Sequence, residues 1–302
     1  MKRKAVTFNV LKGGLGKSTL TKNTAAVLGL HHRVLVVDCD DNGHLTKHLG
    51  FKEQFNKGDK LHEFLDPIED VTVDDLIYET GFGFDLLHST RKMDHVELEI
   101  ENMAQPDHVI RREIVEPLIK DKYDFILFDT PANKSLMTRN AIAASGNLII
   151  PLKPGEQAKD GLTATYERLY LEYNSKLEGG VNLLSVVPNQ INDRIDQHNK
   201  DRELLETINT HDRDIIQNAV PNFARLPHKV WSAIDNGELS SNPLPGIRRD
   251  SNLNEPAPIT ETAPDSRTME YFKELANVVR NGGIERNENI ADDIINDHKV
   301  KQ

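Results

Sequence analysis

Several short stretches of the chain combine residue types and spacings that suit phosphate chemistry. The first is KGGLGKST, residues 12–19, which follows a β-rich run and precedes a run of good helix formers. Glycines let the backbone bend so that successive N–H groups point at phosphate oxygens, and a helix N-terminus adds positive partial charge. This strand–loop–helix order predicts a nucleotide site. The expected contacts are Gly13, Gly14, Leu15, Gly16, Lys17, Ser18 and Thr19.

Two lysines flank the glycines of this loop. Lys17 is expected to reach the β- and γ-phosphates, and the hydroxyl of Ser18 is expected to bind Mg²⁺. Lys12 stands before the first glycine, where a plain phosphate-binding loop needs no lysine. Its alternative role is that of a solvated loop side chain.

Carboxylates follow two aliphatic runs further along the chain. VLVVD (34–38) leads to Asp38 and Asp40, and FILFD (125–129) ends in Asp129. Carboxylates at the end of a buried strand are costly to desolvate unless they meet a metal or water. The second run has the Walker B pattern, in which the aspartate is linked to Mg²⁺. A solvated acidic loop is the alternative for the first pair.

With these motifs the sequence resembles the deviant Walker A family, which includes the ParA partition ATPases and MinD and has the pattern KGG-x-GK-[ST]-[ST]. Lys12 falls on the signature lysine of that family. The resemblance implies that Lys12 crosses a dimer interface to the phosphates held by the other subunit, so that two chains sandwich two ATP molecules. It also implies a catalytic set of Lys12, Lys17 and Asp40, in which Asp40 orients the attacking water. Asp38 would lie near the water shell of Mg²⁺.

The chain departs from the family pattern beside these carboxylates. Asp41 and Asn42 stand where Pro and Gln are usual, and Ala132 replaces the second Pro of the DxPP motif. The extra carboxylate leaves open a nucleotide-binding protein that signals without appreciable hydrolysis. Asn189 ends a later aliphatic run, where family members often place an asparagine on the adenine. An ordinary turn asparagine is the alternative there.

Aliphatic runs alternate with helical patterns along most of the chain, which predicts an α/β fold. We expect a doubly wound, mostly parallel sheet with helices on both faces and functional loops at the carboxyl ends of the strands. The expected strands lie within 4–10, 33–40, 84–89, 123–131, 146–154 and 181–189. The expected helices lie within 17–30, 107–120, 134–145, 160–177 and 265–281, the last with Asp265 or Ser266 as its N-cap.

Length and composition are compatible with a single enzyme domain. The 302 residues are divided into one P-loop ATPase domain, 1–283, and a polar C-terminal tail, 284–302. The only cysteine, Cys39, permits no intramolecular disulfide and is expected to be buried. No signal peptide and no apolar run of about 18 residues is present, so we expect a cytoplasmic protein.

The resemblance leaves two branches of the family to choose between. ParA-type proteins bind DNA non-specifically as ATP dimers and respond to a centromere-binding, ParB-like partner, whereas MinD-type proteins carry a basic membrane helix. The tail here contains Asp292, Asp293 and Asp297, which an anionic membrane would repel. We therefore favour a nucleoid-associated plasmid or chromosome partition ATPase of the Soj-like class, with no membrane contact. A MinD-like spatial regulator or a non-DNA P-loop enzyme remains the alternative.

The charge balance limits where DNA could bind. With 37 basic and 48 acidic residues, the net charge is −11, so any DNA contact must be confined to one face. Phosphate contacts by a few cations per subunit would give salt-sensitive binding without sequence preference. The candidates are Arg225, Lys229, Arg248, Arg249, Arg267 and Arg280.

Overall fold

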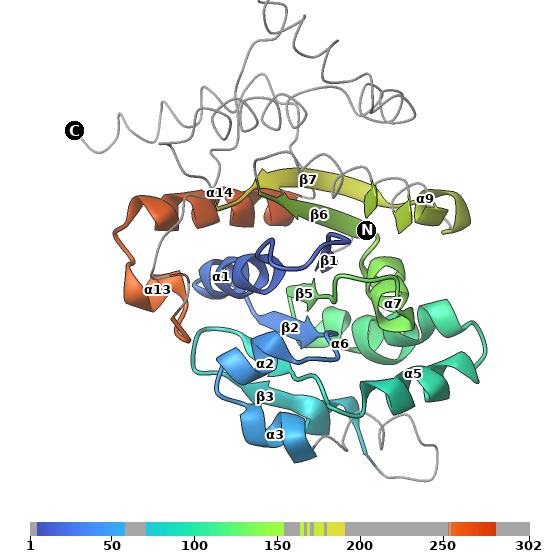
Figure 1. Ribbon diagram of the computed structural model, residues 1–302. Coiled ribbons are helices and arrows are strands. Elements are labelled where there is room, and N and C mark those ends of the chain that lie inside the picture. Colours follow the sequence, from blue (N-terminus) through green and yellow to red (C-terminus); the bar gives the residue numbers. More distant parts are fainter. Residues whose placement is uncertain are drawn as a thin grey trace, which may run out of the picture.

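A seven-stranded sheet forms the centre of the molecule, with the strand order β3-β4-β2-β5-β1-β6-β7 (Figure 1). The computed structural model describes residues 5–57, 71–153, 164–165, 168–169, 172–177, 180–190, 253 and 255–281. The strands are β1 (Ala5–Phe8), β2 (Val34–Asp38), β3 (Ile77–Glu79), β4 (Asp85–Leu87), β5 (Phe125–Asp129), β6 (Asn147–Leu152) and β7 (Asn182–Pro188).

Parallel pairing brings the chemically interesting loops to one edge of this sheet. β1 pairs in parallel with β5 and β6, and β2 pairs in parallel with β5 and β4. In this register Asp38, the last residue of β2, lies opposite Asp129, the last residue of β5. The six strands expected from the sequence are confirmed. β3, which pairs antiparallel with β4, was not predicted.

Helices cover both faces of the sheet (Figure 1). The α-helices are α1 (Lys17–Gly29), α2 (His44–His48), α3 (Lys52–Lys57), α5 (Met93–Glu101), α6 (Glu116–Asp121), α7 (Leu136–Ser145), α9 (Glu172–Lys176), α13 (Ile259–Thr262) and α14 (Arg267–Asn281). Two short 3₁₀-helices, η1 (Val73–Leu76) and η2 (Pro106–His108), and a π-helical turn, η3 (Arg111–Val115), complete the described elements.

The side chains of each strand alternate between two hydrophobic cores, as a pleated strand requires. On one face Val34 and Val36 of β2 pack with residues of α1 and α14. On the other face Leu35 and Val37 pack with residues of α5, α6 and α7. Because both faces are covered, the strands read as continuous apolar runs, which is why the sequence revealed them.

The predicted helices over 17–30, 134–145 and 265–281 are confirmed, whereas most of the predicted helix over 160–177 lies outside the described residues, with α9 at its end. The expected helix over 107–120 is divided into η2, η3 and α6. α14 begins at Arg267, and the N–H of Met269 donates to the Ser266 hydroxyl over 3.1 Å, so Ser266 rather than Asp265 is the N-cap. The tail 284–302 lies outside the described residues.

Candidate nucleotide-binding site

The phosphate loop joins β1 to α1 at the carboxyl edge of the sheet. Gly14 and Gly16 have φ values of 74° and 87°, a left-handed conformation that favours glycine. A Cβ built on Gly13 or Gly14 would meet nothing within 4 Å, so the outer side of the loop faces open space. α1 starts directly after Gly16, which brings its first N–H groups to the same place. The loop therefore has the conformation and the room that a phosphate needs.

Lys17 is buried at the start of α1 among carboxylates. Burial lowers its pKa, and the negative charges of Asp129 and Asp40 offset part of that effect. Lys12 in the loop, and Ser18 and Thr19 in the first turn of α1, are half-buried. The structure thus brings the predicted loop residues and the predicted carboxylates together.

Asp129 provides the strongest test of whether a metal ion fits here. Its side chain is fully buried, and neither carboxylate oxygen has a hydrogen-bond partner of ordinary geometry among the described residues. Burial and the charge of Asp38 raise its pKa well above the usual value, while the Ser18 hydroxyl and Lys17 act in the opposite direction. Ser18 and Lys17 offset only part of the cost of burying this carboxylate, and a cation bound beside it would offset more.

The side chains around Asp129 suit Mg²⁺ better than a metal ion whose ligands are all protein side chains. Among the described residues, no cluster of three or more His, Cys, Asp or Glu side chains could hold a metal ion. Mg²⁺ is usually held by one or two carboxylates with water and substrate phosphates. Asp129 and Ser18 therefore fit this ion, with Asp38 close by.

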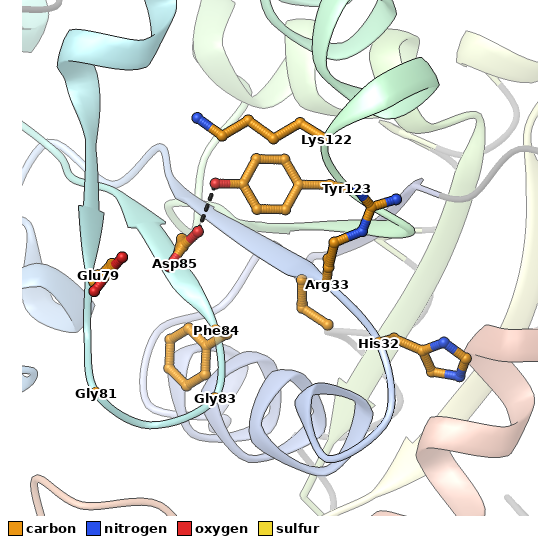
Figure 2. Close-up of a pocket in the computed structure, with 10 residues that line it drawn as sticks. His32, Arg33, Glu79, Gly81, Gly83, Phe84, Asp85, Lys122 and Tyr123 are labelled. Atoms are coloured by element: carbon orange, nitrogen blue, oxygen red, sulfur yellow. Dashed lines mark hydrogen bonds between the residues drawn. The ribbon is translucent and has the colours of Figure 1, made fainter.

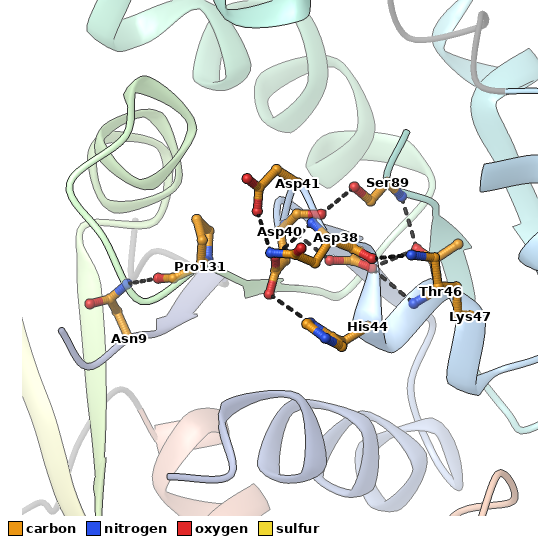
Figure 3. A network of polar contacts seen from close by, with 10 residues as sticks. Asn9, Asp38, Asp40, Asp41, His44, Thr46, Lys47, Ser89 and Pro131 are labelled. Carbon is orange, nitrogen blue, oxygen red and sulfur yellow. Dashed lines mark hydrogen bonds and ion pairs between the residues drawn. The ribbon is translucent and has the colours of Figure 1, made fainter. Parts of the chain in front are cut away.

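Asp38 organises the loop that follows β2 (Figure 3). One of its oxygens accepts the N–H of Asp40 at 3.1 Å, and the other accepts the N–H and the hydroxyl of Thr46 at 2.9 and 2.6 Å. The Thr46 hydroxyl in turn accepts the N–H of Ser89, at the end of β4. Burial raises the pKa of Asp38 to about 6, against the effect of the Thr46 hydrogen bonds. Asp38 thus fixes the position of Asp40.

Asn42 holds the two neighbouring carboxylates of the same loop. Its side-chain amide donates to Asp40 at 3.2 Å and to Asp41 at 2.8 Å, and its backbone N–H donates to Asp40 at 2.9 Å. His44 lies 3.4 Å from the other oxygen of Asp40 (Figure 3). Burial opposes ionisation, but these hydrogen bonds keep the pKa of Asp40 below its ordinary value. The Asp41–Asn42 departure from the family pattern therefore leaves Asp40 ionised and oriented.

Asn9 is a site residue that the motifs did not single out. It follows β1 directly, is fully buried, and donates from its amide to the Thr130 hydroxyl at 2.6 Å. The same amide donates to the Pro131 carbonyl at 3.1 Å (Figure 3). It therefore ties the start of the phosphate loop to the segment after β5. The feature of the sequence that could have identified Asn9 is a polar residue at the end of an apolar run.

Asn189 follows β7 and lies against the phosphate loop. Its amide nitrogen donates to the carbonyl of Leu15 over 2.9 Å, and the side chain is 3% exposed. The predicted adenine contact is not tested by this geometry and stays a prediction. The neighbouring Gln190, which the sequence did not single out, donates to the carbonyl of Gly14 over 2.9 Å.

The predicted DNA contacts lie mostly beyond the described part of the chain. Arg280 is exposed in the last turn of α14, and Arg267 is the first residue of that helix. The other candidates fall outside the described residues; they are Arg225, Lys229, Arg248 and Arg249. This part of the prediction remains untested.

A hollow of about 540 Å³ lies at the opposite, amino-terminal edge of the sheet (Figure 2). Some of its polar lining residues are already paired with other protein groups. The Tyr123 hydroxyl donates to Asp85 over 2.6 Å, and Arg33 pairs with Asp124 at 3.3 Å. Burial and Asp85 raise the pKa of Tyr123. In doubly wound folds ligands bind at the carboxyl ends of the strands, so this hollow is distinct from the nucleotide site.

Comparison with known proteins shows which family the chain matches. Residues 3–179 match a family model described as an AAA domain. The sporulation initiation inhibitor protein Soj of Bacillus subtilis is 27% identical over 287 residues, covering 93% of this chain and 99% of Soj. A match to an uncharacterized Pseudomonas putida protein, 31% identical over 159 residues, spans only 57% of that relative and 50% of this chain.

Solved structures share the fold. Cobyrinic acid a,c-diamide synthase from Mycobacterium smegmatis, with bound ATP analog and magnesium, has a TM-score of 0.65 at 19% identity, covering 91% of this chain and 93% of the synthase. The cell division ATPase MinD of Pyrococcus furiosus has a TM-score of 0.61 at 25% identity, covering 93% of this chain and 99% of MinD. No helix in the described part of the chain is long and apolar enough to cross a membrane.

Proposed function

Because the chain belongs to the AAA-domain family and is a P-loop ATPase of the ParA/Soj type, we propose that it uses ATP to control binding to DNA. It binds ATP with Mg²⁺, dimerises through the nucleotide and, as a dimer, binds DNA without sequence preference. Hydrolysis is slow and is stimulated by a centromere-binding, ParB-like partner. The observation that carries the proposal is the phosphate loop, which has the extra lysine Lys12 before its glycines and whose Lys17 lies among the carboxylates of Asp129 and Asp40.

The proposed mechanism assigns a task to each side chain. The loop N–H groups and Lys17 bind the phosphates, and Lys12 reaches the nucleotide of the partner subunit. Asp40, held ionised by Asn42, orients the attacking water and can accept its proton. Ser18 and Asp129 would hold Mg²⁺, which when bound neutralises charge on the phosphate oxygens.

DNA binding depends on dimerisation in this proposal. One subunit of net charge −11 can offer only a local group of cations to the phosphate backbone. Two subunits joined by nucleotide present two such groups on one rigid body, and the second contact is then intramolecular. The ATP-bound dimer therefore binds DNA at the nucleoid, and hydrolysis releases it.

Retention on immobilised random-sequence DNA tests the proposal, with liposomes of anionic lipid as the second surface. Each surface is presented to the protein with ATP–Mg²⁺, with ADP–Mg²⁺ or without nucleotide, at two salt concentrations. We expect DNA retention only with ATP–Mg²⁺ and a loss of retention at high salt. Lys17→Ala should abolish retention, whereas Lys52→Ala, which removes an exposed lysine on α3, should not.

The other results would overturn the proposal in distinct ways. Nucleotide-dependent retention on liposomes alone would indicate a MinD-like regulator acting at membranes. Retention on neither surface, with ATP turnover intact, would indicate an enzyme or switch that acts on another substrate. DNA retention that ignores the nucleotide would mean that ATP does not control binding.

A further inference from the structure

Two side-chain amides that follow β7 hold the phosphate loop from behind. Asn189 donates to the carbonyl of Leu15 and Gln190 donates to the carbonyl of Gly14, both over 2.9 Å. Leu15 and Gly14 are more than 170 positions away in the sequence. Two adjacent carbonyls of the loop therefore receive one amide donor each from a distant strand.

The peptide geometry turns these two hydrogen bonds into an orientation of the loop N–H groups. In a trans peptide the C=O and the following N–H point in opposite directions. Carbonyls of Gly14 and Leu15 that face the amides therefore direct the N–H groups of Leu15 and Gly16 the other way. These N–H groups are the donors that a phosphate-binding loop uses.

The loop and the amides are fitted closely to each other. A Cβ on Gly16 would lie only 2.1 Å from the amide nitrogen of Asn189, so no other residue at position 16 leaves this contact intact. The backbone N–H of Asn189 donates to Leu152 of β6 over 2.7 Å, which anchors the amide to the sheet. The position of the contact is thus set by the strands.

Gln190 maintains its contact from an unfavourable backbone conformation. Its φ of 57° lies in the left-handed region, and Gln105 is the one other non-glycine residue in the described part of the chain with positive φ. A conformation of this kind persists where the surrounding structure determines it, and it is found most often at functional sites.

We propose that Asn189 and Gln190 are positioning residues that hold the phosphate loop ready for nucleotide before any nucleotide binds. The inference rests on the proposed nucleotide site. It does not depend on DNA binding or on dimerisation. Its ligand is the phosphate chain itself, so the effect of the amides is the same for any base attached to that chain.

Equilibrium binding of ATP, ADP, GTP and inorganic tripolyphosphate tests the proposal. Gln190→Met keeps the length of the side chain and removes the amide donor. Loss of one neutral hydrogen bond should weaken ATP, ADP and tripolyphosphate binding by a similar factor, about three- to tenfold. KM for ATP should rise by the same factor, and kcat at saturation should change less.

Matched variants separate positioning from other effects. Gln105→Met makes the same substitution at the other glutamine with a positive φ, far from the phosphate loop in sequence. It should leave tripolyphosphate binding unchanged. Gln190→Gly relieves the left-handed backbone but removes the donor, so it should bind phosphate as weakly as Gln190→Met. Hydrogen exchange without nucleotide should be faster at the amides of Leu15 and Gly16 in both Gln190 variants.

Three results would overturn the inference. Unchanged tripolyphosphate binding in Gln190→Met would show that the amide does not position the loop. A loss for Asn189→Ala confined to ATP, with tripolyphosphate and GTP unaffected, would assign Asn189 to the adenine instead. Unchanged exchange at the loop amides would mean that the loop is ordered without the amides. If wild-type protein failed to bind any of these ligands, the proposed nucleotide site itself would be wrong.

Discussion

Asp40 is the carboxylate whose surroundings best match a water-orienting role. Against the effect of burial, hydrogen bonds from Asn42 and His44 lower its pKa, and its backbone carbonyl accepts the Ser89 hydroxyl, which holds its position. The neighbouring Asp41 has a raised pKa, because burial and the proximity of Asp40 disfavour a second charge. The extra carboxylate beside Asp40 is therefore accommodated by its own raised pKa and by the amide of Asn42, which donates to both side chains.

Asp40→Ala should abolish turnover while leaving the ATP-dependent dimer intact. Removal of a water-orienting base typically lowers kcat by about 100-fold or more. Phosphate release under saturating ATP measures the rate, and light scattering measures the dimer. Glu53→Ala, an exposed carboxylate on α3, serves as the control and should turn over normally. Native turnover in Asp40→Ala would refute the assignment of the catalytic carboxylate.

Lys12→Ala should separate nucleotide binding from dimerisation. Lys12 precedes the first glycine and is half-buried. In the proposed mechanism Lys17 and the loop N–H groups bind the phosphates of the same subunit, which leaves Lys12 for the phosphates of the partner. We expect the variant monomer to bind ATP with an affinity within about threefold of the wild-type value. The ATP-dependent dimer should be lost, because the two phosphate chains would then face each other without the positive charges of Lys12 between them. Sedimentation with a non-hydrolysable ATP analogue distinguishes the two; a stable dimer in the variant would place Lys12 outside the interface.

At the scale of elements, the segment before α13 is fastened to α1 and α2. The amine of Lys22 in α1 donates to the carbonyls of Glu255 and Pro256 at 2.6 and 3.4 Å. A ring nitrogen of His48 in α2 lies 2.7 Å from the Glu255 carbonyl. Asn23 accepts the N–H of Ile259 over 2.7 Å. The helix that begins at the phosphate loop is therefore linked directly to the C-terminal helices.

Burial of Lys22 should make stability depend on pH. Burial lowers its pKa from 10.5 to about 8, although the charge of Glu255 acts in the opposite direction. Between these values the unfolded chain binds more protons than the folded chain, so the free energy of unfolding rises as the pH increases from about 8 toward 10.5. From pH 7.5 to 9.5 this group should add about 2 kcal/mol.

Urea unfolding of wild type and Lys22→Met at pH 7.5, 8.5 and 9.5 measures this contribution. The difference in unfolding free energy between the two proteins should shift by about 2 kcal/mol in favour of wild type over this range. Lys57→Met, an exposed lysine on α3, should show no such shift against wild type. A difference independent of pH would mean that the amine of Lys22 titrates normally in the folded protein.

The sequence was sufficient to predict those elements and residues whose pattern lies within a short stretch of the chain. Lys17 and Asp129 were found because loop, strand and helix follow one another along the chain. The contact between Asn189 and Leu15 spans 174 positions, and that between Asn9 and Thr130 spans 121, so only folding brings the partners together. β3 has only three residues and is the last strand at one end of the sheet, which leaves too short a pattern to read.

For the molecule as a whole, the net charge of −11 requires that any DNA contacts of the proposed dimer be few and localised, so the effect of single cations on DNA binding can be tested. Arg280→Glu should weaken ATP-dependent DNA binding and reduce the salt dependence by about one unit of log–log slope per subunit. Lys273→Glu makes the same charge change on α14, but Lys273 is paired with Glu270 at 2.6 Å and should matter less for DNA. Fluorescence anisotropy with random-sequence DNA across a salt series measures both variants. Equal losses would show that net charge alone accounts for the effect, and no loss in either would place the DNA-binding face away from the end of α14.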